Sequence, residues 1–130
     1  MKGNGDAARA WLAKGESDLA AAHVCINANV ALDAACFHCQ QAAKKFLKPW
    51  LIARETQFPF VHDLGKLVSL CAASEAEFER LQPEALMLTP FAIQIRYSAE
   101  FWPTKSDANL ALEAAKTVRR VVMERWPARS

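Results

Sequence analysis

Apolar residues recur at steps of three and four along most of the chain, which is the spacing of one side of an α-helix. The clearest example lies between residues 33 and 48, where one stripe consists of Ala35, Cys36, Cys39, Ala42, Ala43, Phe46 and Leu47. A polar strip runs beside it at the same spacing and consists of His38, Gln41, Lys45 and Lys48. We expect this helix to pack its stripe into a core and to turn its strip toward a ligand, a partner or solvent.

Two helices are predicted in the first half of the chain. The first runs from Asp6, which can cap it, to about residue 28, after a flexible start over residues 1–5. Its apolar side consists of Trp11, Leu12, Leu19, Ala22 and Ile26. The second helix runs from about residue 31 to residue 54 and contains Pro49, which lacks an N–H. We therefore expect this helix to bend or break locally near residues 45–48.

Three further helices are predicted, over about residues 62–73, 74–95 and 106–126. Pro83 and Pro90 should divide the middle one into two or three pieces, because proline interrupts helical hydrogen bonding. We expect the last helix to bury a stripe of Ala111, Ala114 or Ala115, Val118, Val121 and Val122. Caps are predicted at Asp63, at Ser74 in the capping-box pattern S-x-x-E, and at Ser106 or Asp107.

These segments predict an all-α fold, a five-helix antiparallel (up-and-down) bundle. The chain has 130 residues, of which 52% are hydrophobic, so it can bury one sizeable core. We expect a single domain over residues 1–130. The four glycines form neither G-x-G-x-x-G nor a P-loop pattern, so the common phosphate-binding loops are excluded.

The charges nearly balance, with 16 basic and 14 acidic residues. Such a chain lacks the strong overall field that attracts nucleic acid, so any contact with a polyanion must depend on a local patch. A mildly basic surface is predicted near the C-terminus, where Glu113 and Glu124 alone balance Lys116, Arg119, Arg120, Arg125 and Arg129. No apolar run reaches the length of a membrane helix or a secretory leader, which favours a cytoplasmic protein without a membrane partner.

Cys36-x-x-Cys39 with His38 between them resembles part of a zinc or redox site. A structural zinc site needs about four ligands, and the chain has no second C-x-x-C and no H-x3-5-H. We therefore expect reduced thiols that pack in the core, with no metal and no cofactor. A thiol or metal sensor at these cysteines is a third functional hypothesis.

Several short motifs follow one another in a recognisable order. They are A-R-A-W-L-x-K at residues 8–14, S-D-L at 17–19, C-F-H-C-Q-Q-A-A-K-K-F-L-K at 36–48, H-D-L at 62–64 and R-Y at 96–97. Together they resemble the small prokaryotic HEPN domain over nearly the whole chain. The resemblance implies a five-helix bundle that forms a homodimer. It also implies a minimal nucleotidyltransferase as partner, in an arrangement typical of toxin–antitoxin pairs.

Some members of the family that this chain resembles are metal-independent RNases that carry Arg-x4-6-His. The arginine that matches is Arg96, and the residues at the corresponding distance are Phe101, Trp102 and Pro103. The catalytic motif is therefore incomplete. A second departure is Lys44, where the family commonly has an acidic residue, which makes this helix more basic than usual.

The candidate ligand-binding or partner-binding residues are His38, Gln41, Lys44, Lys45, Asp63 and Arg96. The candidates for a catalytic role are Arg96, Tyr97 and His62. The leading hypothesis is a dimeric HEPN-like module, non-catalytic or weakly catalytic, that acts with a nucleotidyltransferase and binds nucleotide or RNA. The alternative is a metal-independent RNase toxin in which His62 or Tyr97 replaces the missing histidine.

Overall fold

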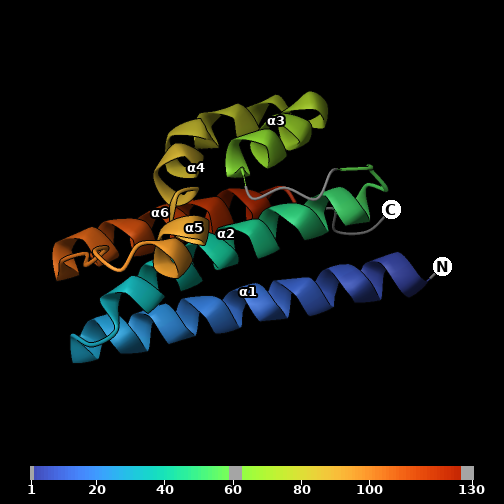
Figure 1. The fold of residues 1–130 in the computed structure, drawn as a ribbon. Helices are drawn as coiled ribbons and strands as arrows, with labels where there is room; N and C mark the ends of the chain where they lie inside the picture. Colours follow the sequence, from blue (N-terminus) through green and yellow to red (C-terminus); the bar gives the residue numbers. More distant parts are fainter. Residues whose placement is uncertain (1, 59–62, 127–130) are drawn as a thin grey trace.

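The computed structural model describes residues 2–58 and 63–126, and for residues 2–4 and 95–97 it describes the helix but not the side chains. This part of the chain contains helices and no strand (Figure 1). They are α1 (Lys2–Ala28), α2 (Leu32–Ala53), α3 (Leu64–Ser74), the 3-10 helix η1 (Ala76–Leu81), α4 (Gln82–Leu88), α5 (Phe91–Tyr97) and α6 (Lys105–Glu124). The predicted all-α five-helix bundle is confirmed, with η1, α4 and α5 in place of the fourth helix.

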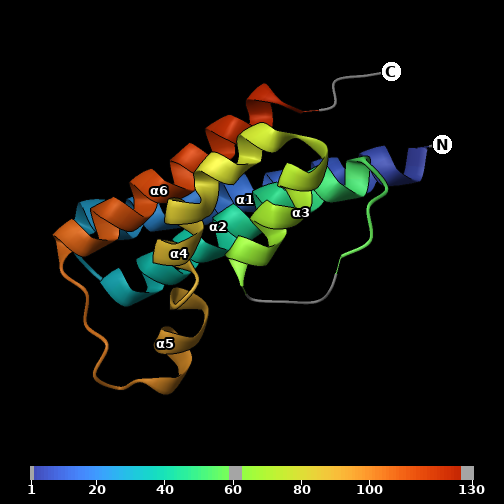
Figure 2. The ribbon, with the colours of Figure 1, turned by 90° about the horizontal axis from the view of Figure 1, so that it is seen from above.

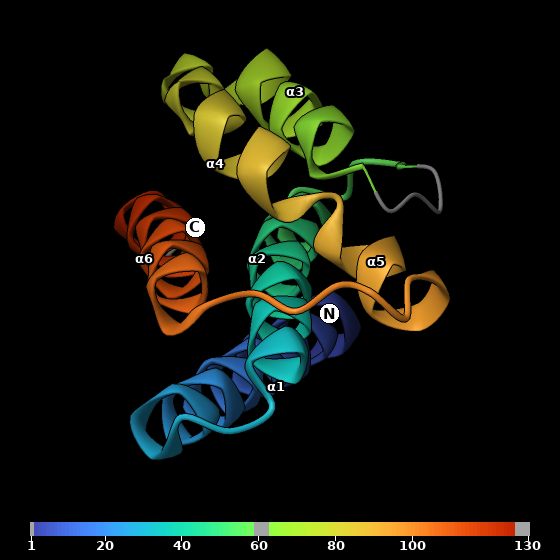
Figure 3. The ribbon, with the colours of Figure 1, turned by 60° about the vertical axis from the view of Figure 1, so that its left-hand side comes forward.

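Helix α2 lies at the centre of the bundle. In a view close to its axis, α1, α6, α5 and the α3–α4 layer lie around it (Figure 3). Every residue of α2 is buried or half-buried, as expected of a central helix. Helix α1 runs in the opposite direction to α2, whereas α6 runs in the same direction (Figure 2). The ends of α2 and α6 consequently meet, and Trp50 Nε1 donates to the carbonyl oxygen of Arg125 over 2.8 Å.

The core consists of the predicted stripes. All seven stripe residues of α2 between Ala35 and Leu47 are fully buried, together with Trp50 and Leu51. On α6 the buried residues include Ala111, Ala114, Ala115, Val118, Val121 and Val122, so that stripe is confirmed as well. A ring contact between Trp50 and Phe78, with centroids 4.7 Å apart, joins α2 to η1 across this core.

Helix α1 differs from the prediction at its start and along one edge. It begins at Lys2, so Asp6 lies inside the helix and does not cap it. Its buried side consists of Ala8, Gly15, Asp18, Leu19, Ala22 and Ile26. Trp11, which we predicted on this side, is 42% exposed because the stripe that meets α2 passes beside it.

The helix caps agree with the sequence only in part. Asp63 caps α3 as predicted, since its carboxylate accepts from the Gly65 N–H over 2.9 Å. The prediction of a cap at Ser74 was wrong, because α3 continues through this residue and the 3-10 helix after it begins without a side-chain cap. Thr104 caps α6, and Asp107 completes a capping box with it instead of capping the helix itself.

The prolines act differently in the two places where we expected them to interrupt a helix. Helix α2 continues unbroken through Pro49, which is buried, so the predicted local break is absent. Pro83 lies in the first turn of α4 and Pro90 precedes α5, so the predicted division of the region after Ser74 is confirmed. No helix within the described ranges is long and apolar enough to cross a membrane.

Candidate ligand site on helix α2

The predicted polar strip meets a buried carboxylate of α1. His38 Nδ1 lies 2.8 Å from Oδ1 of Asp18, and Lys45 Nζ lies 2.8 Å from Oδ2 of the same side chain. The Asp18 side chain is 11% exposed, that of Lys45 is 20% exposed and that of His38 is 34% exposed. We call these three residues the Asp18 cluster. It holds its carboxylate at the buried end and presents its imidazole and ammonium groups toward the surface.

The close approach of α1 and α2 makes this cluster possible. Gly15 lies on the buried side of α1, three residues before Asp18. A Cβ at Gly15 would lie 3.1 Å from the nearest atoms of the Phe46 ring, which is fully buried. The glycine therefore lets the α1 backbone pack directly on Phe46, and the short Asp18 side chain can then reach α2.

The Asp18 carboxylate determines which nitrogen of His38 donates. An ionised carboxylate only accepts hydrogen bonds, so Nδ1 carries the proton that faces Asp18. In the neutral ring the other nitrogen, Nε2, is then an acceptor, and in the charged ring it is a donor. The carboxylate thus orients the ring and selects one tautomer, as in other Asp–His pairs.

The rest of the strip continues along α2. Gln41 donates from Nε2 to Oε1 of the fully buried Gln40 over 2.7 Å, which fixes its side chain on the helix surface. Lys48 of the strip is half-buried, and its Nζ lies 5.7 Å from the centroid of the Phe58 ring; Lys44, which lies beside the strip, is half-buried as well. Burial lowers the pKa of Lys48. The strip therefore combines partly desolvated cations with one imidazole.

The other candidate residues lie outside the Asp18 cluster. Asp63 caps α3 at the edge of a groove of about 670 Å³ between α3 and α4, whose lining includes Lys66 and Leu86. Arg96 and Tyr97 belong to the last turn of α5, where the structure does not describe the side chains. His62 lies outside the described residues. The catalytic roles considered for these three residues stay predictions.

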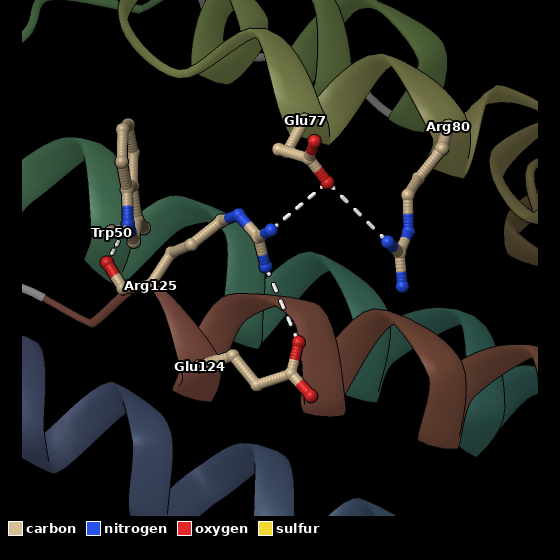
Figure 4. Close-up of polar contacts among 5 residues, drawn as sticks. All are labelled: Trp50, Glu77, Arg80, Glu124 and Arg125. Carbon is tan, nitrogen blue, oxygen red and sulfur yellow. Dashed lines mark hydrogen bonds and ion pairs between the residues drawn. The ribbon is translucent and has the colours of Figure 1, made fainter.

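A second polar network joins the ends of α2, η1 and α6 (Figure 4). The Arg125 guanidinium lies 2.9 Å from Glu77 and 3.3 Å from Glu124, and Arg80 lies 3.4 Å from the same Glu77 oxygen. The carbonyl oxygen of Arg125 accepts from Trp50. This network fastens the end of α6 to the bundle, which is a structural role.

The C-terminal basic surface is more balanced than the sequence suggests. Glu16 of α1 lies 2.6 Å from Arg119, and Glu77 pairs with Arg125, in addition to the contact of Glu113 with Lys116. The prediction that Glu113 and Glu124 alone balance this region was wrong, because two acidic residues from other helices reach it. The arginines are therefore poorer candidates for an RNA contact than the strip on α2.

The cysteines pack as predicted. Cys36, Cys39 and Cys71 are fully buried, and the four cysteines form no disulfide. Burial raises the pKa of Cys36 to about 11 and the pKa values of Cys39 and Cys71 to about 12, so these thiols stay protonated at neutral pH. Among the described residues no group of three metal-binding side chains gathers around them.

Comparison with known proteins gives one family and two similar structures. The sequence profile of the HEPN domain matches residues 8–126. TT1696 from Thermus thermophilus is 26% identical with a TM-score of 0.75, over 91% of this chain and 97% of that one. ST0689, an archaeal HEPN homologue, is 21% identical with a TM-score of 0.71, over 91% and 96% of the two chains, and shares the fold. No curated protein matches the chain significantly.

Proposed function

The chain belongs to the HEPN domain family, and we propose that it is a non-catalytic or weakly catalytic binding module of a cytoplasmic toxin–antitoxin pair. It forms a homodimer, acts with a minimal nucleotidyltransferase and binds the phosphates of a nucleotide or RNA along α2. The observation that carries the binding proposal is the Asp18 cluster, because it fixes a lysine and a histidine side by side at a partly exposed surface.

The chemistry of the strip supports an anionic ligand. Lys45 has three N–H donors and directs one of them to Asp18, so its other donors can bind phosphate oxygens. Lys44 and Lys48 lie within one turn of Lys45 on the same helix. Partly buried cations bind phosphate more strongly than fully solvated ones, because water screens them less.

A low or absent catalytic activity is supported by the spacing after Arg96. The residues where a family RNase would carry its histidine are Phe101, Trp102 and Pro103. His38 belongs to α2 and is held by Asp18. An arginine that lacks a neighbouring histidine to accept and donate protons gives little general acid–base catalysis.

Apolar side chains at the surface support the proposed protein partners. Leu86 is 79% exposed and Trp102 is 75% exposed, while Ile93 and Leu110 are more than half exposed. Large exposed apolar residues, and tryptophan above all, are typical of protein interfaces. A homodimer and a nucleotidyltransferase complex would each cover part of this surface.

Calorimetric titration of the protein with ATP tests the binding proposal. Replacing Lys44 and Lys45 together by glutamine should weaken ATP binding by roughly a hundredfold, about tenfold for each charge-assisted contact. Lys116→Gln is the matched control, because Lys116 contacts Glu113 on α6 and should leave the affinity unchanged. Equal loss in both variants, or no ATP binding by the wild type, would contradict the proposal.

Light scattering and co-purification test the partners. The dimer should have twice the 14.4 kDa mass of the chain. A nucleotidyltransferase encoded beside this protein should co-purify with it. A strictly monomeric protein that binds no such enzyme would refute this part, and metal-independent RNA cleavage that Arg96→Ala abolishes would favour the RNase toxin instead.

A further inference from the structure

The Asp18 cluster offers two different hydrogen-bonding groups to one ligand. Neutral His38 presents an acceptor at Nε2, because Asp18 holds the proton on Nδ1. Lys45 presents donors and a positive charge. A simple phosphate site has no use for an acceptor beside its cation, since phosphate oxygens at neutral pH mainly accept. The pair matches a ligand that carries a hydroxyl group close to a phosphate.

We propose that His38, positioned by Asp18, selects ribonucleotides over deoxyribonucleotides by accepting a hydrogen bond from the ribose 2′-hydroxyl. This inference rests on the proposed function, in which α2 binds a nucleotide, and it names the sugar that the site reads. The 2′-hydroxyl is the group by which proteins distinguish ribose from deoxyribose. Its proton needs an acceptor, which lysines alone cannot supply.

The arrangement of the strip fits a nucleotide lying along α2. His38 and Lys45 are seven positions apart on the helix, but their side chains meet at the two oxygens of one carboxylate. A nucleotide can therefore place its ribose at His38 and its nearest phosphate at Lys45. The Phe37 ring, half-buried and 6.1 Å from the His38 ring between centroids, lies at the end of the strip where the base would be.

The exposure of the side chains in the Asp18 cluster also supports a ligand that contacts His38 rather than Asp18. The carboxylate lies at the buried end, where it is 11% exposed, and the imidazole is 34% exposed. Since Nδ1 faces the carboxylate, the opposite edge of the ring, which carries Nε2, is turned away from it. Asp18 therefore acts as a positioning residue and does not itself contact the ligand.

Competition between ATP and 2′-deoxy-ATP tests the proposal on the full-length protein. The wild type should bind ATP about tenfold more tightly, as expected for one hydrogen bond. In His38→Asn the shorter amide can still donate to Asp18, but its acceptor oxygen does not reach the position of Nε2. This variant should bind ATP and 2′-deoxy-ATP about equally, while its affinity for 2′-deoxy-ATP stays within about twofold of the wild-type value. His38→Gln carries an amide oxygen near the position of Nε2 and should recover part of the preference.

A spectroscopic measurement separates positioning from general structural support. Long-range nitrogen–proton NMR spectra of the neutral wild type should show the proton of His38 on Nδ1. In Asp18→Asn the new amide can donate to Nδ1, so the proton should move to Nε2 and the preference for ATP should fall.

The outcomes distinguish this inference from the function on which it rests. Equal binding of ATP and 2′-deoxy-ATP by the wild type, or an unchanged preference in His38→Asn, would overturn the ribose inference and leave nucleotide binding intact. Binding of neither compound would overturn both. A proton on Nε2 of His38 in the wild type would overturn the role given to Asp18.

Discussion

Removing the negative charge of Asp18 should destabilise the protein far more than removing a similar charge at the surface of the same helix. Asp18→Asn keeps the size of the side chain and removes the charge that His38 and Lys45 share at 2.8 Å. Because the aspartate is 11% exposed, water replaces these contacts poorly. The substitution therefore tests whether the Asp18 cluster holds α1 against α2.

The expected loss follows from the exposure of the partners. A hydrogen bond to a charged group is worth about 1.5–3 kcal/mol when it is removed. Lys45 and His38 are 20% and 34% exposed, so both can regain some hydration, and the new amide can still accept one bond. We expect a total loss of about 2 kcal/mol, which lowers Tm by roughly 6–10 °C in a domain of this size.

Urea denaturation followed by circular dichroism at 222 nm measures this loss. Asp6→Asn is the matched control, because Asp6 lies on α1 and its contact with Arg9 at 3.7 Å is largely exposed. The control should change the free energy of unfolding by less than about 0.5 kcal/mol. A double-mutant cycle of Asp18→Asn with Lys45→Met should give a coupling of about 1 kcal/mol. Equal effects of the two aspartate substitutions, or a coupling near zero, would refute the reasoning.

Four further predictions concern packing, titration and thiol reactivity. In thermal melts Gly15→Ala should lower the free energy of unfolding by about 1–2 kcal/mol, because the new Cβ would lie 3.1 Å from the buried Phe46 ring. Gly5→Ala should instead raise it by up to about 1 kcal/mol, because there the new Cβ would meet only the end of the Arg9 side chain at 3.5 Å. Trp50→Phe should cost about 1–2 kcal/mol in urea denaturation, through the lost bond to the Arg125 carbonyl; an unchanged midpoint would contradict the stabilising role of this bond. Burial raises the pKa values of the three core thiols to about 11 or 12, so the unfolded thiols ionise first, and stability should fall as the pH rises from about 9 toward 11. In native protein a thiol reagent should modify only the half-buried cysteine of α1, and fast reaction of all four would contradict this burial.

The sequence predicted the helices and the core well because burial repeats with the helical period. The α2 stripe from Ala35 to Leu47 is fully buried, and the stripe of α6 behaves in the same way. Trp11 departs from this rule because it lies at the edge of the contact between α1 and α2. The period identifies the buried side of a helix, whereas the width of that side depends on how its neighbour is placed.

Helix ends were harder to predict because several residues near each end can act as caps. Thr104 and Asp107 together form the capping box of α6, although Ser106 lies between them and is also a good cap residue. Ser74 matches the S-x-x-E pattern but belongs to the end of α3. Local sequence permits each choice, and the packing of the connecting segments selects one.

The candidate site was only half visible in the sequence. His38 and Lys45 stood out because they share a strip with regular spacing, whereas Asp18 received no role although it lies in the S-D-L motif. Its contacts join residues 20 and 27 positions apart, and they depend on how α1 is placed along α2. The contact of Glu16 with Arg119 was missed for the same reason, since 103 positions separate them.

Mapping ATP binding by NMR would test most directly that α2 carries the functional surface of this HEPN protein. Backbone amide signals should shift on addition of ATP at His38, Gln41 and Lys45, and at Asp18 across the helix contact. The groove between α3 and α4, near Leu86, should stay unchanged. Shifts confined to that groove, or no shifts at millimolar ATP, would contradict the account.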